Sequence, residues 1–132
     1  MIVVDSSAWI ELYRDSGHPV AATVERLLDT DQPVAVTEIV AMELLAGART
    51  ETEAHELHDR LMGFEFLLLE GLADYEQAAT LYRICRRQGE TIRRMTDCLI
   101  AVPAIRAGAE VLHKDRDFDA IARHSDLRVF QV

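Results

Sequence analysis

The chain has 132 residues and a formal net charge of −9; 49% of its residues are hydrophobic and 28% are charged. These values are typical of one globular domain, here residues 1–132, and no apolar run approaches the roughly 18 residues that a membrane-spanning helix needs. Because it has no basic leader and only two cysteines, Cys85 and Cys98, we expect a cytoplasmic protein with neither a disulfide framework nor a Cys/His zinc site.

Strand and helix signals alternate along the chain. The β-branched run Ile2–Val4 predicts a short buried strand, and the apolar spacing in 8–13 predicts a helix that Ser6 or Ser7 caps. Further helices are predicted over about 19–29, 37–47, 51–62, 73–88, 94–107 and 117–123, and further strands over 34–36, 64–69, 110–113 and 127–132. This alternation predicts an α/β fold with a mostly parallel sheet covered on both faces.

Acidic residues directly follow two of the predicted strands. Asp5 ends the first strand, where open α/β sheets bind their ligands, and its structural alternative is a helix cap. Asp115 follows the strand 110–113 in the same way. Asp117 and Asp119 continue an acidic turn there, and such turns are also common after strands without any function.

Two further carboxylates lie in apolar surroundings. Glu43 lies within a helix that is apolar nearly all round, so it needs a partner or a cation unless it lies at the rim. Asp97 precedes the apolar run Cys98–Val102. Its structural alternative is an ordinary carboxylate at a helix N-terminus, which the helix dipole favours.

The predicted topology allows four of these acids to meet at one edge of the sheet. Asp5 and Asp115 leave the carboxyl ends of strands, and Glu43 and Asp97 lie near the starts of helices. Four carboxylates in one crevice cannot all stay ionised without cations, and oxygen-only ligands suit Mg²⁺ or Mn²⁺ rather than zinc. The pattern therefore predicts a divalent-cation site suited to phosphate chemistry.

Arginines cluster beside Asp97 although the chain as a whole is acidic. The net charge of −9 argues against nucleic acid, because non-specific affinity comes from neutralising phosphates. The local cluster argues the other way, and its structural alternative is a solvated helix face. Its members are Arg83, Arg86, Arg87, Arg93 and Arg94.

Together these motifs resemble those of a known family. The similarity is to the spaced acidic signature of PIN-domain ribonucleases, and more closely to VapC-type toxins of bacterial toxin–antitoxin pairs. The residues that carry it are Val4–Ser7, the helix around Glu43, Asp97 before Ile100 and Ala101, and Asp115–Phe118. The resemblance spans essentially the whole chain. It implies a three-layer fold with a five-stranded, mostly parallel sheet flanked by helices, and Mg²⁺-dependent RNA hydrolysis with Mn²⁺ as a substitute.

The resemblance also implies roles for individual acids. Asp5 and Asp97 would be the principal metal ligands. Glu43 and Asp115 would complete the catalytic cluster, and Asp115 also counts among the expected metal ligands. Asp117 would contribute as an outer or second-metal ligand.

The substrate side of the expected site is RNA. Ser7 matches a hydroxyl position that helps to hold metal or phosphate, and the five clustered arginines are candidates to bind RNA phosphates. A metal-bound water would attack a phosphodiester in a single-stranded or loop segment, such as a loop of tRNA or rRNA. The resemblance implies products with a 5′-phosphate and a 3′-hydroxyl.

Two positions depart from the expected pattern. His113 stands where the family often has Thr or Ser, and we expect it to cap the strand rather than to touch substrate. Pro103 lies six residues after Asp97, inside the predicted helix 94–107. It removes the hydrogen bond to the carbonyl of Leu99, so we expect a kink or shift that would alter how Asp97 is presented.

The resemblance further implies protein partners. VapC-type proteins are neutralised by a small antitoxin that lays a segment along the toxin and covers the active site, and a homodimer is a second expectation. Apolar residues on two predicted helices are candidates for the antitoxin groove or the dimer face, with core packing the expected alternative for most of them. They are Trp9, Leu12, Tyr13, Leu44 and Leu45.

Two other protein classes remain as alternatives. A haloacid-dehalogenase-type phosphatase also begins with a buried strand that ends in Asp, but it needs a second acid where this chain has Ser7, and a lysine for which only Lys114 is available. A non-enzymatic receiver domain has a similar size and sheet. It needs a phosphoacceptor Asp after the third strand, where Leu69-Glu70-Gly71 supplies none.

Overall fold

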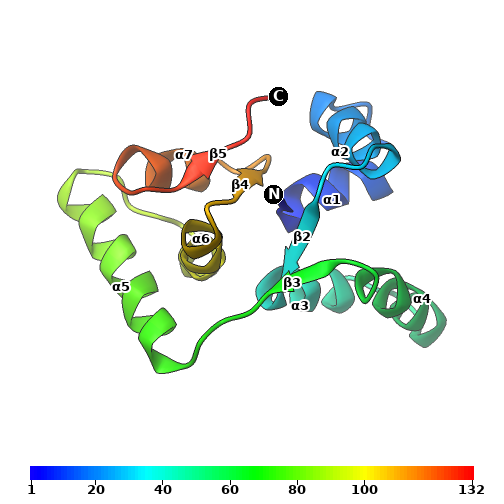
Figure 1. Cartoon of the computed structure of the whole chain (residues 1–132), viewed down its shortest axis with the longest axis horizontal. Coiled ribbons are helices and arrows are strands. Elements are labelled where there is room, and N and C mark those ends of the chain that lie inside the picture. Colours follow the sequence, from blue (N-terminus) through cyan, green and yellow to red (C-terminus); the bar gives the residue numbers. More distant parts are fainter.

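The computed structural model describes residues 1–132 and contains one sheet of five parallel strands (Figure 1). The strands are β1 (Ile2–Val4), β2 (Val34–Thr37), β3 (Glu65–Leu67), β4 (Glu110–Leu112) and β5 (Arg128–Val129), in the spatial order β3-β2-β1-β4-β5. β1 is the central strand, with Ile2 beside Val34 on one side and Glu110 on the other. The parallel α/β sheet predicted from the sequence is confirmed, although β3 and β5 are shorter than predicted.

Helices flank the sheet on both sides of its central strand. They are α1 (Ser6–Tyr13), α2 (Pro19–Asp29), α3 (Glu38–Ala46), α4 (Glu51–Leu61), α5 (Leu72–Arg87), α6 (Met95–Ala107) and α7 (Arg116–Arg123). In Figure 1, α5, α6 and α7 gather beside β4 and β5, whereas α1 to α4 lie on the other side of the molecule. Contacts between α3 and α6 join the two groups.

Side chains at strand ends cap the helices that follow. The carboxylate of Asp5 caps α1 by accepting the amide of Ser7 at 3.0 Å, so the predicted serine cap is wrong. Thr37 ends β2 and caps α3 as predicted, because its Oγ1 accepts the amide of Val40 at 3.2 Å. Each cap satisfies a free backbone amide and fixes the direction in which its helix leaves the sheet.

The helix α6 continues through Pro103 without interruption from Met95 to Ala107. The expected disturbance therefore does not break the helix. Ile100 and Ala104, on either side of the proline, are fully buried. Tertiary packing of this apolar helix holds its backbone despite the hydrogen bond that Pro103 cannot make.

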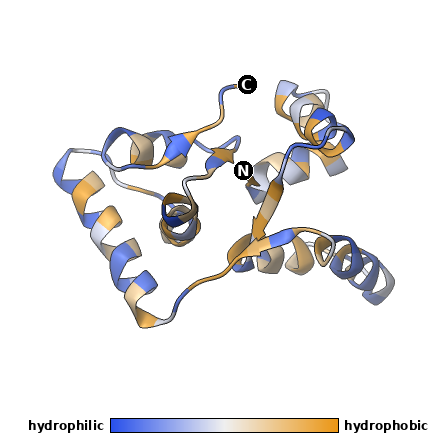
Figure 2. Cartoon of the chain, in the orientation of Figure 1, coloured by the Kyte–Doolittle hydropathy of each residue, from blue (hydrophilic) through white to orange (hydrophobic).

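The hydrophobic core is centred on β1 and α6. Val3 and Val4 have no exposed surface, which explains why the first strand reads as an unbroken apolar run. Figure 2 shows hydrophobic residues along β2, while β5 is partly and α4 largely hydrophilic. None of the helices combines the length and the apolar character that crossing a membrane requires.

Candidate active site

The sheet places two acids, Asp5 and Asp115, at the carboxyl ends of its central strand β1 and of the neighbouring strand β4. β1 and β4 are neighbours. The amide of Asp5, the first residue after β1, donates to the carbonyl of Leu112, the last residue of β4, at 2.9 Å. Asp115 caps α7 three residues after β4 ends. Asp97 and Asp117 lie in the first turns of α6 and α7.

Asp97, Asp115 and Asp117 form the tightest acidic group. Each contributes one carboxylate oxygen, and these three oxygens all lie within 4.8 Å of one another. Asp5, of which 1% is exposed, interacts electrostatically with Asp97 and Asp115. Glu43, from α3, interacts in the same way with Asp5 and Asp115. The structure thus gathers the five acids that the sequence analysis singled out, and their catalytic and metal-binding roles stay predictions.

Burial and like charges keep a proton within this group. Burial raises the pKa of Asp97 to about 9, and a hydrogen bond to Asp115 and the charge of Asp5 act in the same direction. At Asp115 burial also acts to raise the pKa, but hydrogen bonds from Asp97 and from the Asp117 amide, together with the charges of Arg93 and Arg94, outweigh it, so the pKa is lowered. Two carboxyls this close share a proton unless a cation replaces it.

Two buried carboxylate oxygens of the site have no hydrogen-bond partner, namely Asp5 Oδ1 and Asp97 Oδ2. Burial raises the pKa of Asp5 although Ser7 donates hydrogen bonds that oppose the rise. Because buried polar atoms are nearly always paired, these two oxygens fit a ligand that is a cation. The donors are all carboxylate oxygens, which are the ligands that Mg²⁺ and Mn²⁺ prefer.

The two serines after Asp5 connect the elements that carry the acids. Ser7 Oγ donates to Asp5 Oδ2 at 2.6 Å and accepts the amide of Lys114 at 2.9 Å, so it joins the ends of β1 and β4. Ser6 is buried and donates to Glu43 Oε1 at 3.3 Å. The sequence analysis names Ser6 only as a possible helix cap and not as a site residue; its position next to Asp5 was the available signal.

Glu43 differs from the aspartates because it is partly open to solvent, with 23% of its side chain exposed. Burial, followed by the nearby charge of Asp5, raises its pKa. Its Oε2 lies 3.9 Å from Nη1 of Arg94. Glu43 therefore holds a proton more readily than an exposed glutamate, which suits a group that exchanges protons with solvent or substrate.

Asp117 fixes the segment that precedes α6. Its Oδ2 accepts the backbone amides of Arg93 at 3.1 Å and Arg94 at 3.2 Å. The guanidinium of Arg93 lies 3.6 Å from Asp115 and 3.7 Å from Asp117. Two of the five clustered arginines are therefore beside the acids.

The chain is similar in sequence to proteins of a known family. A family described as the PIN domain matches residues 2–124 of the chain. The chain belongs to the PIN-domain family. Ribonuclease VapC11 of Mycobacterium tuberculosis is 43% identical over 129 residues, which are 97% of this chain and 96% of that protein, so the chain also belongs with the VapC ribonucleases. This membership sets aside the phosphatase and receiver alternatives.

Solved structures confirm the PIN-like fold. The structure of VapBC2 from Rickettsia felis bound to a promoter DNA fragment matches with a TM-score of 0.72 and 18% identity, covering 98% of each chain. VapC20 of M. tuberculosis, described as a toxin that cleaves the sarcin–ricin loop, matches with a TM-score of 0.66 and 19% identity over 97% of this chain and 99% of that chain. At this level of identity the likeness concerns the fold.

The other three arginines of the cluster predicted from the sequence are Arg83, Arg86 and Arg87. They lie on the last turns of α5 and are exposed. Arg83 donates to Thr80 of its own helix, and the guanidinium of Arg86 lies over the ring of Tyr82, 5.6 Å from its centroid. Neither these two nor Arg87 forms an ion pair with the acidic group. Their predicted contact with RNA stays a prediction.

His113 supports the turn between β4 and α7. Its Nδ1 accepts the amide of Asp115 at 2.9 Å, and its Nε2 lies 3.3 Å from Asp119 Oδ1. The ring packs against Phe118 with 5.2 Å between centroids. These contacts agree with the expectation that His113 caps the strand end, and they orient Asp115 toward the site.

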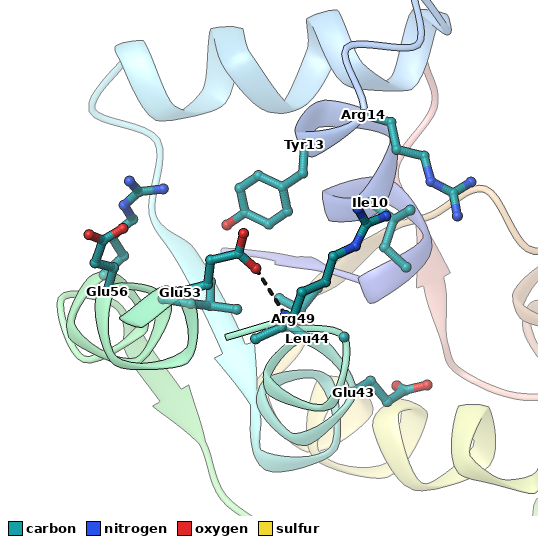
Figure 3. Close-up of a pocket in the computed structure, with 12 residues that line it drawn as sticks. Ile10, Tyr13, Arg14, Glu43, Leu44, Arg49, Glu53 and Glu56 are labelled. Carbon is teal, nitrogen blue, oxygen red and sulfur yellow. Dashed lines mark hydrogen bonds between the residues drawn. The ribbon is translucent and has the colours of Figure 1, made fainter. Parts of the chain in front are cut away.

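A cavity of about 540 Å³ opens between α1, α3 and α4 of the PIN domain (Figure 3). Tyr13 and Leu44 line it, as does Glu43, whose carboxylate in Figure 3 extends away from the other labelled side chains. Glu43 therefore belongs both to the cavity and to the acidic group. The other apolar candidates pack in or against the core: Trp9, Leu12 and Leu45.

Proposed function

We propose that this VapC ribonuclease is the Mg²⁺-dependent endoribonuclease toxin of a type II toxin–antitoxin pair and hydrolyses phosphodiester bonds in a loop of structured RNA such as tRNA or rRNA. The observation that carries the proposal is the gathering of five acids around two buried, unpartnered carboxylate oxygens. We place its action in the cytoplasm, together with its RNA.

Asp5, Asp97 and Asp115 are the residues that would hold the metal ion. Asp5 and Asp97 each have one buried oxygen without a hydrogen-bond partner, and Asp115 contributes an oxygen to the acidic group. Asp117 would contribute through Oδ1, since its Oδ2 is used by two backbone amides. When bound, such an ion supplies Lewis-acid stabilisation of phosphate oxygens and a lower pKa for an attacking water. Mn²⁺ is expected to substitute for Mg²⁺ because both take oxygen ligands.

The chain's own residues would perform the remaining work of the reaction. Glu43 Oε2 would accept the proton of the attacking water, since its pKa is raised and its side chain is partly open to solvent. Arg93 and Arg94 would hold the phosphate that reacts. Ser6 and Ser7 keep the acids in position through their hydroxyl groups. A local pair of arginines beside the site reconciles RNA binding with the net charge of −9.

The cavity between α1, α3 and α4 is the proposed docking site of the antitoxin. VapBC2 of Rickettsia felis, VapBC-1 of Haemophilus influenzae and a toxin–antitoxin complex from Klebsiella pneumoniae share this fold. A segment in the cavity would contact Tyr13 and Leu44 and would reach Glu43 at its edge. The antitoxin would thereby cover the acidic group. A homodimer is also proposed, and light scattering of the purified protein tests it.

The direct test of the proposed function is RNA cleavage by the purified protein. The wild type should cut RNA with Mg²⁺ or Mn²⁺ and stop when the ion is chelated. Asp97→Asn and Asp5→Asn should lower the rate about a hundredfold or more, whereas Asp126→Asn, at an exposed residue, should not. An Asp97→Asn protein that cuts RNA at the normal rate would overturn the proposal.

A further inference from the structure

Two guanidinium groups lie against the acidic group without forming hydrogen bonds to it. Arg93 is 3.6 Å from Asp115 and 3.7 Å from Asp117, and Arg94 is 3.9 Å from Glu43. Both side chains are 59% exposed. Ion pairs that are this long and this exposed neutralise charge but hold their partners weakly.

The backbone that carries these arginines is held much more firmly than their side chains. Asp117 accepts both backbone amides. Glu90, at the other end of the segment 88–94 between α5 and α6, is bound by Arg123 of α7 and by His124, which follows that helix. The guanidinium groups are thus attached to a fixed support beside the site. They are free to change partners without any movement of the main chain.

We propose that Arg93 and Arg94 are exchangeable counterions of the acidic group. In the metal-free protein they offset the repulsion among Glu43, Asp115 and Asp117. A divalent cation that enters the site takes over this task, and the released guanidinium groups turn to the RNA phosphate. The second half of the proposal rests on the proposed function, whereas the first half concerns the metal-free protein alone.

The chemistry of the two partners favours such an exchange. A hard divalent cation competes for the same carboxylate oxygens that the two guanidinium groups face, and it carries twice the charge of either. Arginine in turn binds phosphate through paired, directional N–H groups. The side chains of Arg93 and Arg94 would therefore stabilise the metal-free site and, once a metal ion is bound, bind the RNA phosphate.

Calorimetric titration with Mn²⁺ tests the first half without any RNA. Arg93→Gln and Arg94→Gln remove the competing cation and should tighten Mn²⁺ binding about twofold to fivefold each, the range expected from losing an exposed ion pair. The main-chain bonds to Asp117 remain, so the variants should fold. Arg26→Gln removes the same charge from an exposed position on α2 and should leave the affinity unchanged.

Two outcomes would overturn the exchange. One is Mn²⁺ binding that is unchanged or weaker in both site variants. The other is tightening that Arg26→Gln reproduces, because it would show a general effect of net charge. NMR provides a second measurement. When Mg²⁺ is added, the Nε–H signals of Arg93 and Arg94 should shift, and their relaxation should show more mobile side chains. Unaltered signals would also contradict the release of the guanidinium groups from the acids.

Cleavage kinetics test the second half. At saturating Mn²⁺, Arg93→Gln should raise KM for RNA more than it lowers kcat, although the same variant binds the metal more tightly. An unchanged KM would refute the proposal that Arg93 binds the RNA phosphate. If the wild type cuts no RNA, the proposed function fails, and the titration still decides the counterion role by itself.

Discussion

At Asp97 the effect of the surroundings on the pKa exceeds the effect of its position at the start of a helix. It lies in the first turn of α6, where the helix dipole favours a carboxylate, yet its pKa is raised to about 9. Burial is the largest cause, and the neighbouring acids act in the same direction. The sequence predicts the helix position of Asp97, but only the fold brings Asp5 and Asp115 close to it.

The raised pKa of Asp97 predicts the pH dependence of stability without metal. The folded protein holds this proton up to about pH 9, whereas the unfolded chain loses it near 3.8. The unfolded state therefore binds fewer protons in this interval, and stability should fall as pH rises from about 4 to about 9. The measurement is the melting temperature of the metal-free protein across this range.

A variant isolates this effect. Asp97→Asn carries no titrating group at the position, so its melting temperature should depend much less on pH over the same interval. Mg²⁺ should stabilise the wild type more at high pH, because metal binding displaces the proton. A wild-type and a variant profile with equal slopes would contradict the assigned pKa.

Ser7 predicts a second effect at this scale. Ser7→Ala removes the hydrogen bond to Asp5 and the acceptor for the Lys114 amide, so we expect a loss of about 1–3 kcal/mol in the free energy of unfolding and weaker Mn²⁺ binding. Urea unfolding and calorimetry measure the two effects. Ser7→Thr keeps the hydroxyl group and serves as the control; a loss equal to that of Ser7→Ala would show that the hydroxyl is unimportant.

The elements show which local signals determine position and which do not. Thr37 was predictable as a cap because Thr is a preferred N-cap residue and directly precedes an apolar helix. This cap directs α3, which carries Glu43, toward the site. The cap of α1 was assigned to the wrong side chain, since Asp5 and both serines are good caps by type. The continuity of α6 through Pro103 depends on burial, which the local pattern does not contain.

The cap of α3 gives a prediction at this scale. Thr37→Ala leaves the amide of Val40 without its acceptor and should lower the free energy of unfolding by about 1 kcal/mol, measured with urea. Thr37→Ser retains the acceptor oxygen and should lose less. If the two variants are equally stable, the cap does not hold α3 in place.

At the scale of the whole molecule, the parallel topology assembles the site. The alternation of strand and helix signals was sufficient to predict the sheet, and the rule that ligands bind at strand carboxyl ends predicted where Asp5 and Asp115 meet. The strand order and the contact between α3 and α6 were not predictable from local patterns, because they depend on pairings between distant segments. For the same reason Arg93 and Arg94 could not be separated from Arg83, Arg86 and Arg87.

X-ray diffraction from a crystal of this protein soaked in Mn²⁺, recorded for anomalous signal, measures the central claim most directly. We predict a strong anomalous peak within coordination distance of Asp97 and Asp115, with an oxygen of Asp5 directed toward it, and no such peak in Asp97→Asn crystals. A fully soaked wild-type crystal with no peak among these carboxylates would contradict the account.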